Sequence, residues 1–232
     1  TLISSAEMDA SAAKAYGDIL AEARKKERLN RDRAQTERVR AIANRLIPST
    51  AAFRPDAPRW KWEVNVITSE EVNAWCMPGG KIAFYTGLID KLKVTDDELA
   101  AVMGHEIAHA LREHGRERAS EQMAKQLGIS VLSIALGLGD TSVQLTQALL
   151  DVTFSLPNSR THETEADRIG VELAARSGYD PRAAVSLWQK MGKLGGGSPP
   201  QWLSTHPSHE SRIRDLQNYS ERVMPLYESA KR

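Results

Sequence analysis

The feature that most constrains this chain is an H-E-x-x-H motif in residues 104–110. On an α-helix, His105 and His109 lie about 40° apart and one turn from each other, so both imidazoles can reach one point off the helix surface. Two ring nitrogens that meet at one point can hold a zinc ion. Glu106 lies about 100° from His105, which suits a base that acts beside the metal. The rival interpretation is two histidines on a half-buried helix face.

The residues around the motif predict the helix that it needs. Thr95 is typical of an N-cap and Glu98 of its capping-box partner, so we expect the helix to begin there. We expect it to end near Gly115, which would be the residue that follows the last turn. On such a helix His114 is rotated about 140° from the face of His109. His114 is therefore expected to be an exposed helix-end histidine, with a role as third ligand as the lesser alternative.

Before this helix the hydrophobic period changes to that of strands. Residues 60–66 alternate between apolar and polar side chains, and further extended segments cover residues 72–77 and 81–86 around a Pro-Gly-Gly turn. These segments predict a small antiparallel sheet in a mainly helical α+β fold. An extended peptide can pair with the exposed edge of such a sheet through main-chain hydrogen bonds. The pattern alone leaves a substrate-binding edge and an ordinary core sheet equally open.

The first part of the chain predicts a helical extension, residues 1–50, that packs on a main domain of residues 51–232. A thin apolar stripe over residues 6–47 is typical of one long helix or two consecutive ones, which Pro48 closes. Basic residues outnumber acidic ones over residues 24–40. Contact with a membrane surface is therefore an alternative, but the thin stripe favours a solvated helix that packs around the domain.

Helices are also expected after the motif, over residues 121–137 and 141–156. The apolar run at residues 127–136 is too short to span a bilayer, and it predicts a buried core helix. A lid over a cleft or a dip into the membrane surface is the alternative. Two amphipathic helices are expected beyond Pro181, with the Gly/Pro-rich residues 194–200 as a flap between them.

The composition excludes some classes of function. Lys and Arg number 31 and Asp and Glu 30, so the net charge of +1 provides no overall field for nucleic acid. The single cysteine, Cys76, rules out an internal disulfide. No stretch approaches the roughly twenty apolar residues of a membrane-spanning helix. A signal peptide or lipid anchor before Thr1 would be missing from this sequence, so peripheral membrane association stays open.

A second charged segment supplies what the histidine pair lacks. Residues 159–168 predict the start of a helix on which Glu163 and Asp167 share a face. One carboxylate can bind zinc while the other lies beside a ligand histidine, and two histidines with one carboxylate leave a fourth position open, as in catalytic zinc sites. Glu165 lies about 200° from Glu163, so the pairing with Asp167 favours Glu163 as the ligand. The rival interpretation is a solvated helix start.

Together these motifs resemble the gluzincin metallopeptidases of the HtpX and CAAX-prenyl-protease family, peptidase family forty-eight of the metallo class. The resemblance covers about residues 60 to 215. The motifs that carry it are H-E-x-x-H at 105–109, S-R-x-x-E-x-x-A-D at 159–167, N-A at 73–74, P-G-G at 78–80, G-L at 87–88, S-G-Y-D-P at 177–181, T-H-P at 205–207 and R-I at 212–213. Without spanning helices, the chain is similar to the soluble or lipid-anchored bacterial branch.

The resemblance implies a zinc-dependent endopeptidase that hydrolyses unfolded or misfolded envelope proteins. Its expected location is the bacterial periplasm, in association with the outer membrane as one option. Glu106 is implied as the general base that activates a zinc-bound water, and Asp167 as the group that orients His105. The other implied residues are the zinc ligands His105, His109 and Glu163 and the substrate edge strand Asn73, Ala74 and Trp75.

His206 is a further catalytic candidate, because it precedes Pro207 in a short segment after the flexible loop at residues 194–200. It could donate a hydrogen bond to the oxyanion of the reaction. It could instead bind zinc as a fourth ligand in a resting state and withdraw for substrate. An ordinary loop histidine is the third possibility.

The rival function is a chaperone-like binder of unfolded clients with a latent zinc site. A zinc hydrolase that acts on a non-peptide substrate is a weaker rival. Glu106 separates these classes, because a pure binder has no chemical reason to keep a base beside the metal.

Overall fold

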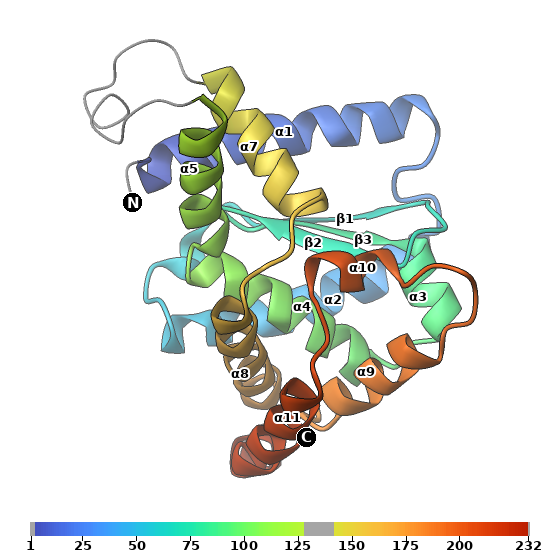
Figure 1. Ribbon diagram of the computed structural model, residues 1–232. Coiled ribbons are helices and arrows are strands. Elements are labelled where there is room, and N and C mark those ends of the chain that lie inside the picture. The colour runs from blue at the N-terminus through green and yellow to red at the C-terminus, as the bar shows by residue number, and fades with distance from the viewer. Residues whose placement is uncertain (1–2, 128–141, 232) are drawn as a thin grey trace.

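The computed structural model describes residues 3–127 and 142–231, and it shows a mainly helical α+β fold around one small sheet, as the sequence predicts (Figure 1). The elements are α1 (Ser5–Lys25), α2 (Arg33–Ser49), β1 (Glu63–Ile67), β2 (Ala74–Met77), β3 (Lys81–Tyr85), α3 (Thr86–Leu92), α4 (Asp96–Leu111), α5 (His114–Leu127), α7 (Ser142–Phe154), α8 (Arg160–Arg176), α9 (Ala183–Lys193), α10 (Gln201–Thr205), α11 (Glu210–Arg222) and α12 (Met224–Ala230), with short 3-10 turns at Thr50–Ala52 and Ala57–Arg59.

The sheet has the strand order β1-β3-β2, with β2 at one edge. β2 and β3 form the predicted antiparallel hairpin, but β1 pairs with β3 in parallel. The expectation of an antiparallel sheet is therefore wrong for one pair, because alternation predicts a strand and not the neighbour it pairs with. Trp60 and Trp62 precede β1 and stack on each other with ring centroids 5.5 Å apart.

Helix α4 lies between the sheet and α8 and is buried on all sides from its first turn onward (Figure 1). It begins at the predicted capping box, in which the Thr95 hydroxyl accepts from Glu98 N and the Glu98 carboxylate accepts from Thr95 N. Every residue over 98–111 is buried, against β2 on one side and α8 and α9 on the other. The H-E-x-x-H motif is therefore held in the interior rather than on a solvated face.

Two glycines allow α8 to approach α4 closely. A Cβ atom on Gly104 would lie 2.8 Å from the carbonyl oxygen of Gly170, and one on Gly170 would lie 2.7 Å from the backbone nitrogen of His105. Both distances are below any normal contact of a Cβ atom, so the two backbones touch at this point. This contact sets the first turns of α8 against the histidine motif.

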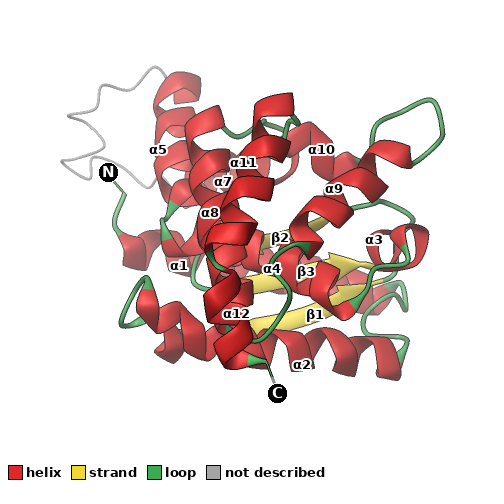
Figure 2. Cartoon of the chain, turned by 90° about the horizontal axis from the view of Figure 1, so that it is seen from below, coloured by secondary structure: helices red, strands yellow, loops and turns green. Residues whose placement is uncertain are grey.

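The N-terminal region forms two separate helices rather than one. Between them Glu27 and Asn30 have positive φ angles of 56° and 50°, which ends α1 and lets the chain reverse. α2 ends at Ser49, one residue after Pro48. It lies along β1 (Figure 2) and contributes apolar side chains to the main core, whereas α1 packs in a second cluster with β2, β3, α5 and α7.

The end of α4 differs from the expectation. The helix stops at Leu111, and the left-handed residue after it is Glu113, with φ of 54°, rather than Gly115. A non-glycine residue in this region costs of order 1 kcal/mol, which surrounding contacts must offset. Glu113 has such contacts, because its carboxylate accepts hydrogen bonds from the Ser5 hydroxyl and from Arg116 Nη2. The chain turns sharply there, and α5 starts at His114.

The remaining helices follow the expectations in part. The predicted apolar core helix at residues 127–136 lies outside the described residues apart from Leu127, while α7 occupies the place of the next predicted helix. α9 and α11 are the two expected amphipathic helices, and α10 lies between them, after residues 194–200. None of the described helices has the length and apolar character needed to cross a membrane.

The contact between α4 and α8 yields a stability test. We expect Gly170→Ala to destabilise the chain by about 1–3 kcal/mol, because the added methyl group forces the two backbones apart. Gly192→Ala is the matched control, since Gly192 is exposed in α9 with nothing within 4 Å of its Cβ position, and it should be neutral or stabilising by up to about 1 kcal/mol. Urea unfolding of both variants measures the difference, and equal stabilities would contradict the close contact.

Candidate metal centre

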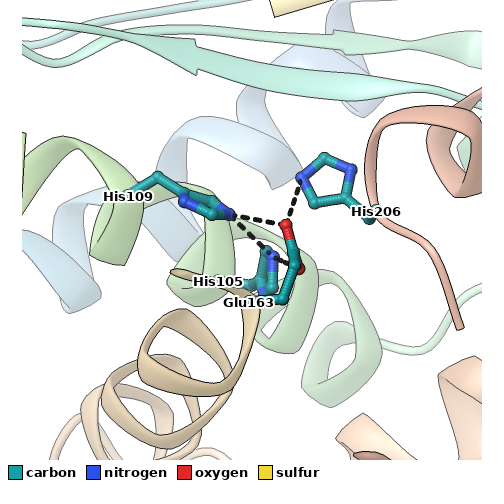
Figure 3. Close-up of side chains that lie close together, drawn as sticks. All are labelled: His105, His109, Glu163 and His206. Atoms are coloured by element: carbon teal, nitrogen blue, oxygen red, sulfur yellow. Dashed lines mark hydrogen bonds and ion pairs between the residues drawn. The ribbon is translucent and has the colours of Figure 1, made fainter. Parts of the chain in front are cut away.

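Four buried side chains, from two helices and from the residue that follows a third, converge on one point (Figure 3). His105 and His109 come from α4, Glu163 comes from the first turn of α8, and His206 follows the end of α10. One possible ligand atom from each lies within 4.8 Å of all the others. The predicted ligands are therefore brought together, and His206 joins them.

The distances between these side chains fit a metal site. The two Nε2 atoms of His105 and His109 lie 3.1 Å apart, and the Glu163 oxygens lie 3.0 Å from His105 Nε2 and 3.2 Å from His109 Nε2. Glu163 is 1% exposed, yet neither of its oxygens accepts a hydrogen bond of good geometry within the described part of the chain. Glu163 forms an ion pair with Arg212 Nη2 at 2.9 Å. A buried carboxylate that otherwise lacks a hydrogen bond of good geometry and faces two imidazole nitrogens is a group that a divalent cation would satisfy. The nitrogen and oxygen donor set suits zinc.

His105 is held from behind by the predicted partner Asp167. The Nδ1 of His105 lies 3.1 Å from an Asp167 oxygen, which leaves Nε2 free to face the metal position. Asp167 also accepts two hydrogen bonds of 2.8 Å from Arg212, whose Nη2 lies 2.9 Å from Glu163 as well. The Nη1 of Arg212 donates to the carbonyl oxygen of Pro207. The sequence prediction assigned no role to Arg212, and its only signal was its place in the motifs that carry the resemblance.

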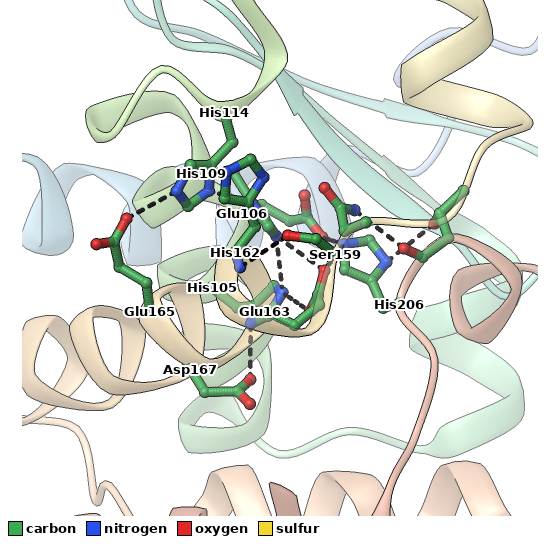
Figure 4. Close-up of polar contacts among 12 residues, drawn as sticks. His105, Glu106, His109, His114, Ser159, His162, Glu163, Glu165, Asp167 and His206 are labelled. Atoms are coloured by element: carbon green, nitrogen blue, oxygen red, sulfur yellow. Dashed lines mark hydrogen bonds and ion pairs between the residues drawn. The ribbon is translucent and has the colours of Figure 1, made fainter. Parts of the chain in front are cut away.

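His114 is buried, at 3% exposure, so the expectation of an exposed helix-end histidine is wrong. The angular argument assumed one continuous helix, but the chain turns at Glu113 and brings His114 back to the motif. Its Nδ1 lies 2.9 Å from the Nδ1 of His109, and its Nε2 lies 2.7 Å from Glu165 (Figure 4). His114 is therefore not in the donor group but behind one of its histidines. His162 stacks on its ring.

The expected base, Glu106, is buried beside the donor group. Its Oε1 accepts a 2.8 Å hydrogen bond from Trp202 Nε1 and lies 3.0 Å from the Nε2 of His206. The rings of Trp202 and His206 stack 4.2 Å apart. The sequence did not predict a role for Trp202. Its position four residues before His206 indicates that the two rings are neighbours only if α10 and its last turn are already known to face the site.

The α10 segment is bound over the site by main-chain contacts. Trp202 N donates to the carbonyl oxygen of Val72, and Asn158 donates to that of Thr205. His206 Nδ1 lies 2.9 Å from both the Trp202 carbonyl oxygen and the Thr205 hydroxyl. The cleft below has about 50 Å³ of space, lined by residues that include Trp75, Cys76, Glu106, His109, Leu149 and His206. Such a space holds a water molecule or two.

The predicted substrate strand lies at this cleft. Asn73 precedes β2, Ala74 and Trp75 begin it, and all three are at most 4% exposed. Trp75 lines the cleft and packs edge-on against Phe154 of α7. The edge of the sheet is therefore next to the site but covered.

The charges of the site perturb its titration. Burial disfavours the protonated form of His105, but the adjacent carboxylates of Glu163 and Asp167 outweigh it and raise the pKa of His105 to about 10. Burial also opposes the charged form of Glu163, but His206, His105 and His109 hold its pKa well below the usual value. Without a metal, a proton on His105 therefore takes part of the cation's place.

We expect zinc affinity to rise with pH from about pH 6 to pH 9, by about tenfold per pH unit. Below its raised pKa the metal-free His105 carries a proton that zinc must displace, so lower pH favours the metal-free form. Competition with a chelator, corrected for the chelator's own protonation, measures the slope. A flat profile would mean that His105 is neutral in the metal-free chain.

Comparisons with known proteins agree with this geometry. The model of "Peptidase family M48" matches residues 33–220. The mitochondrial metalloendopeptidase OMA1 of Arabidopsis thaliana is 40% identical over 168 residues, which are 72% of this chain and 33% of that protein. The β-barrel assembly-enhancing proteases of Escherichia coli and Yersinia pestis are 32% and 27% identical over 69% and 82% of this chain.

The chain spans only 33–40% of the length of these three relatives. The family match nevertheless covers most of the chain, including the histidine motif, Glu163 and His206. The expected zinc cofactor is supported both by this match and by the buried group that could hold a metal. The resemblance seen in the sequence is confirmed, and the chain belongs to peptidase family M48.

Proposed function

We propose that this chain hydrolyses peptide bonds as a zinc-dependent metalloendopeptidase. The observation that carries the proposal is the position of Glu106, a buried carboxylate at the edge of the donor group and 3.0 Å from His206. A zinc site that only stabilised the fold would not need a further carboxylate beside it. The names of the relatives, which include metalloendopeptidases and proteases, support the same activity.

The roles of the side chains follow from their positions. His105, His109 and Glu163 would hold the ion, and Asp167 with Arg212 keeps His105 oriented. When bound, zinc supplies a Lewis acid that polarises a carbonyl oxygen and lowers the pKa of water. Glu106 takes the proton from the attacking water and later transfers it to the leaving amine.

Polypeptides bound in an extended form are the proposed substrates. β2 is an edge strand of the sheet, and Trp75 lines the cleft beside Glu106. A peptide that pairs with the strand start at Asn73 and Ala74 would lie along the metal site and depend little on its own sequence. This suits unfolded clients, whose main chain is accessible.

Unfolded or misfolded proteins of the bacterial envelope, in the periplasm, are the proposed clients. Two bacterial relatives are named as enhancing β-barrel assembly, which supports an envelope location. Other relatives are named as mitochondrial. The net charge of +1 favours no nucleic-acid partner.

We propose that the described arrangement is a resting state in which His206 is the fourth ligand. Its Nδ1 lies 2.9 Å from a backbone carbonyl oxygen, which only accepts, so Nδ1 carries a proton. In the neutral ring Nε2, which lies 3.0 Å from Glu106 Oε1, is then the atom that would bind the metal. Four donors fill a tetrahedral zinc site and leave no open position. Trp202 N also occupies the carbonyl group of Val72 beside the strand where a peptide would pair. While α10 keeps this position over the metal group, these contacts favour the rival function, which is a binder with a latent zinc site.

Hydrolysis of casein by the zinc-loaded chain tests the activity. We expect Glu106→Gln to retain zinc and to lose activity by about 10²–10⁴-fold, because the proton acceptor is removed and the ligands are not. The matched control is Glu221→Gln, an exposed position on α11, which should behave as wild type. Metal content is measured on all three proteins. Zinc-loaded wild type that cleaves nothing would instead favour the binder.

The role of His206 has its own test. We expect His206→Ala to bind zinc more weakly and to hydrolyse casein faster than wild type, because it removes the resting-state ligand and keeps the other three. If His206 is instead a donor to the oxyanion, the same variant should lose about 10²–10³-fold in kcat. The sign of the change in kcat therefore decides between the two roles.

A further inference from the structure

The two histidines of the metal group are supported in different ways. Behind His105 lies a carboxylate, Asp167, which is itself held by Arg212. Behind His109 lies another imidazole, that of His114, and the carboxylate comes only after it, from Glu165 (Figure 4). Neither His114 nor Glu165 has a part in the function proposed above.

The proton positions in this chain of contacts follow from its geometry. A metal at Nε2 of His109 requires the proton of that ring to be on Nδ1. This Nδ1 faces the Nδ1 of His114 at 2.9 Å, so the latter must be without a proton and accept. His114 then carries its proton on Nε2, which lies 2.7 Å from Glu165 Oε1 and donates to it. One arrangement alone satisfies all three groups together.

His114, the middle residue of this chain of contacts, is also fixed in space. The His114 side chain is 4% exposed, and its ring stacks on His162 with centroids 4.0 Å apart and an angle of 11° between the planes. The turn at Glu113 sets its backbone at the start of α5. Glu165, by contrast, is 39% exposed at its side chain and lies 3.4 Å from Arg112. The contacts from His109 through His114 to Glu165 thus form a relay that runs from the buried metal group to the protein surface.

We infer that His114 is a positioning residue for the metal ligand His109, and that Glu165 sets the tautomer of His114 so that the pair governs how tightly the metal is held. The inference concerns the site of the proposed function but rests on metal binding alone. A chain that binds zinc and cleaves no casein would therefore leave it standing.

Substitutions of His114 separate the effect of its hydrogen-bond acceptor, Nδ1, from the effect of its stacked ring. His114→Phe keeps the stacked ring and removes the acceptor, and we expect it to weaken zinc affinity by about 10–100-fold. His114→Asn places an amide oxygen near the position of Nδ1, and we expect it to stay within a few-fold of wild type. His162→Phe keeps the stacking and removes only the contact of the His162 side chain with Glu117, which is 3.3 Å from Nε2, so it is the matched control and should not change the affinity.

Zinc affinity is measured by competition with a chromophoric chelator on the full chain, and unfolding of the metal-free proteins is measured beside it. Rescue by Asn, with metal-free stabilities equal, supports positioning. Equal losses of zinc affinity in the Phe and Asn variants would overturn the inference, because a purely structural role does not depend on an acceptor. An unchanged zinc affinity in His114→Phe would overturn it as well.

Glu165 provides a second test if His114→Phe does not fold, since its position is half exposed. We expect Glu165→Leu, which removes the acceptor for His114 Nε2, to weaken zinc binding by about tenfold, and Glu165→Gln, which keeps an oxygen acceptor, to weaken it less. Long-range ¹H–¹⁵N spectra of the zinc-loaded chain should show His109 protonated at Nδ1. An affinity that is the same in all Glu165 variants would contradict the relay.

Discussion

The site depends on the contact of α4 with α8 at Gly104 and Gly170. With no side chains between the two backbones, the carboxylates of α8 come within hydrogen-bonding distance of the histidines of α4. Three acidic residues of α8 then serve the site in different ways. Glu163 faces the metal group, and Asp167 lies behind His105. Glu165 supports His109 through His114. A wider helix packing distance would separate every one of these pairs.

The burial of charge explains why a cation belongs there. Glu106, Glu163 and Asp167 are each at most 4% exposed, and buried carboxylates are costly unless they are paired. Arg212, also buried, offsets one negative charge, and a divalent ion would offset the other two. The raised pKa of His105 is the response of the metal-free chain to the same imbalance, because a proton on the imidazole is the cation available without a metal.

Much of the site could be predicted from the sequence because its parts are local. The capping box of α4 and the phase of His105 and His109 need only a helix, and the pairing of Glu163 with Asp167 needs only a four-residue spacing. The prediction for His114 was wrong for the same reason. It extended one helical phase across residues 112–113, where the chain turns and starts a new helix.

The sequence by itself determined the residues of the candidate site and the family of this protein: a helix with two histidines and a glutamate, a second helix with the carboxylates, and membership of a metallopeptidase family. Tertiary structure decided which groups meet. Only the folded chain shows β1 parallel to β3, Arg212 on Asp167, His114 behind His109, and Trp202 with His206 over Glu106. The segments that meet in these contacts are separated by loops and chain reversals. Their relative positions therefore do not follow from a helical or strand period and cannot be inferred from the spacing of residues in the sequence.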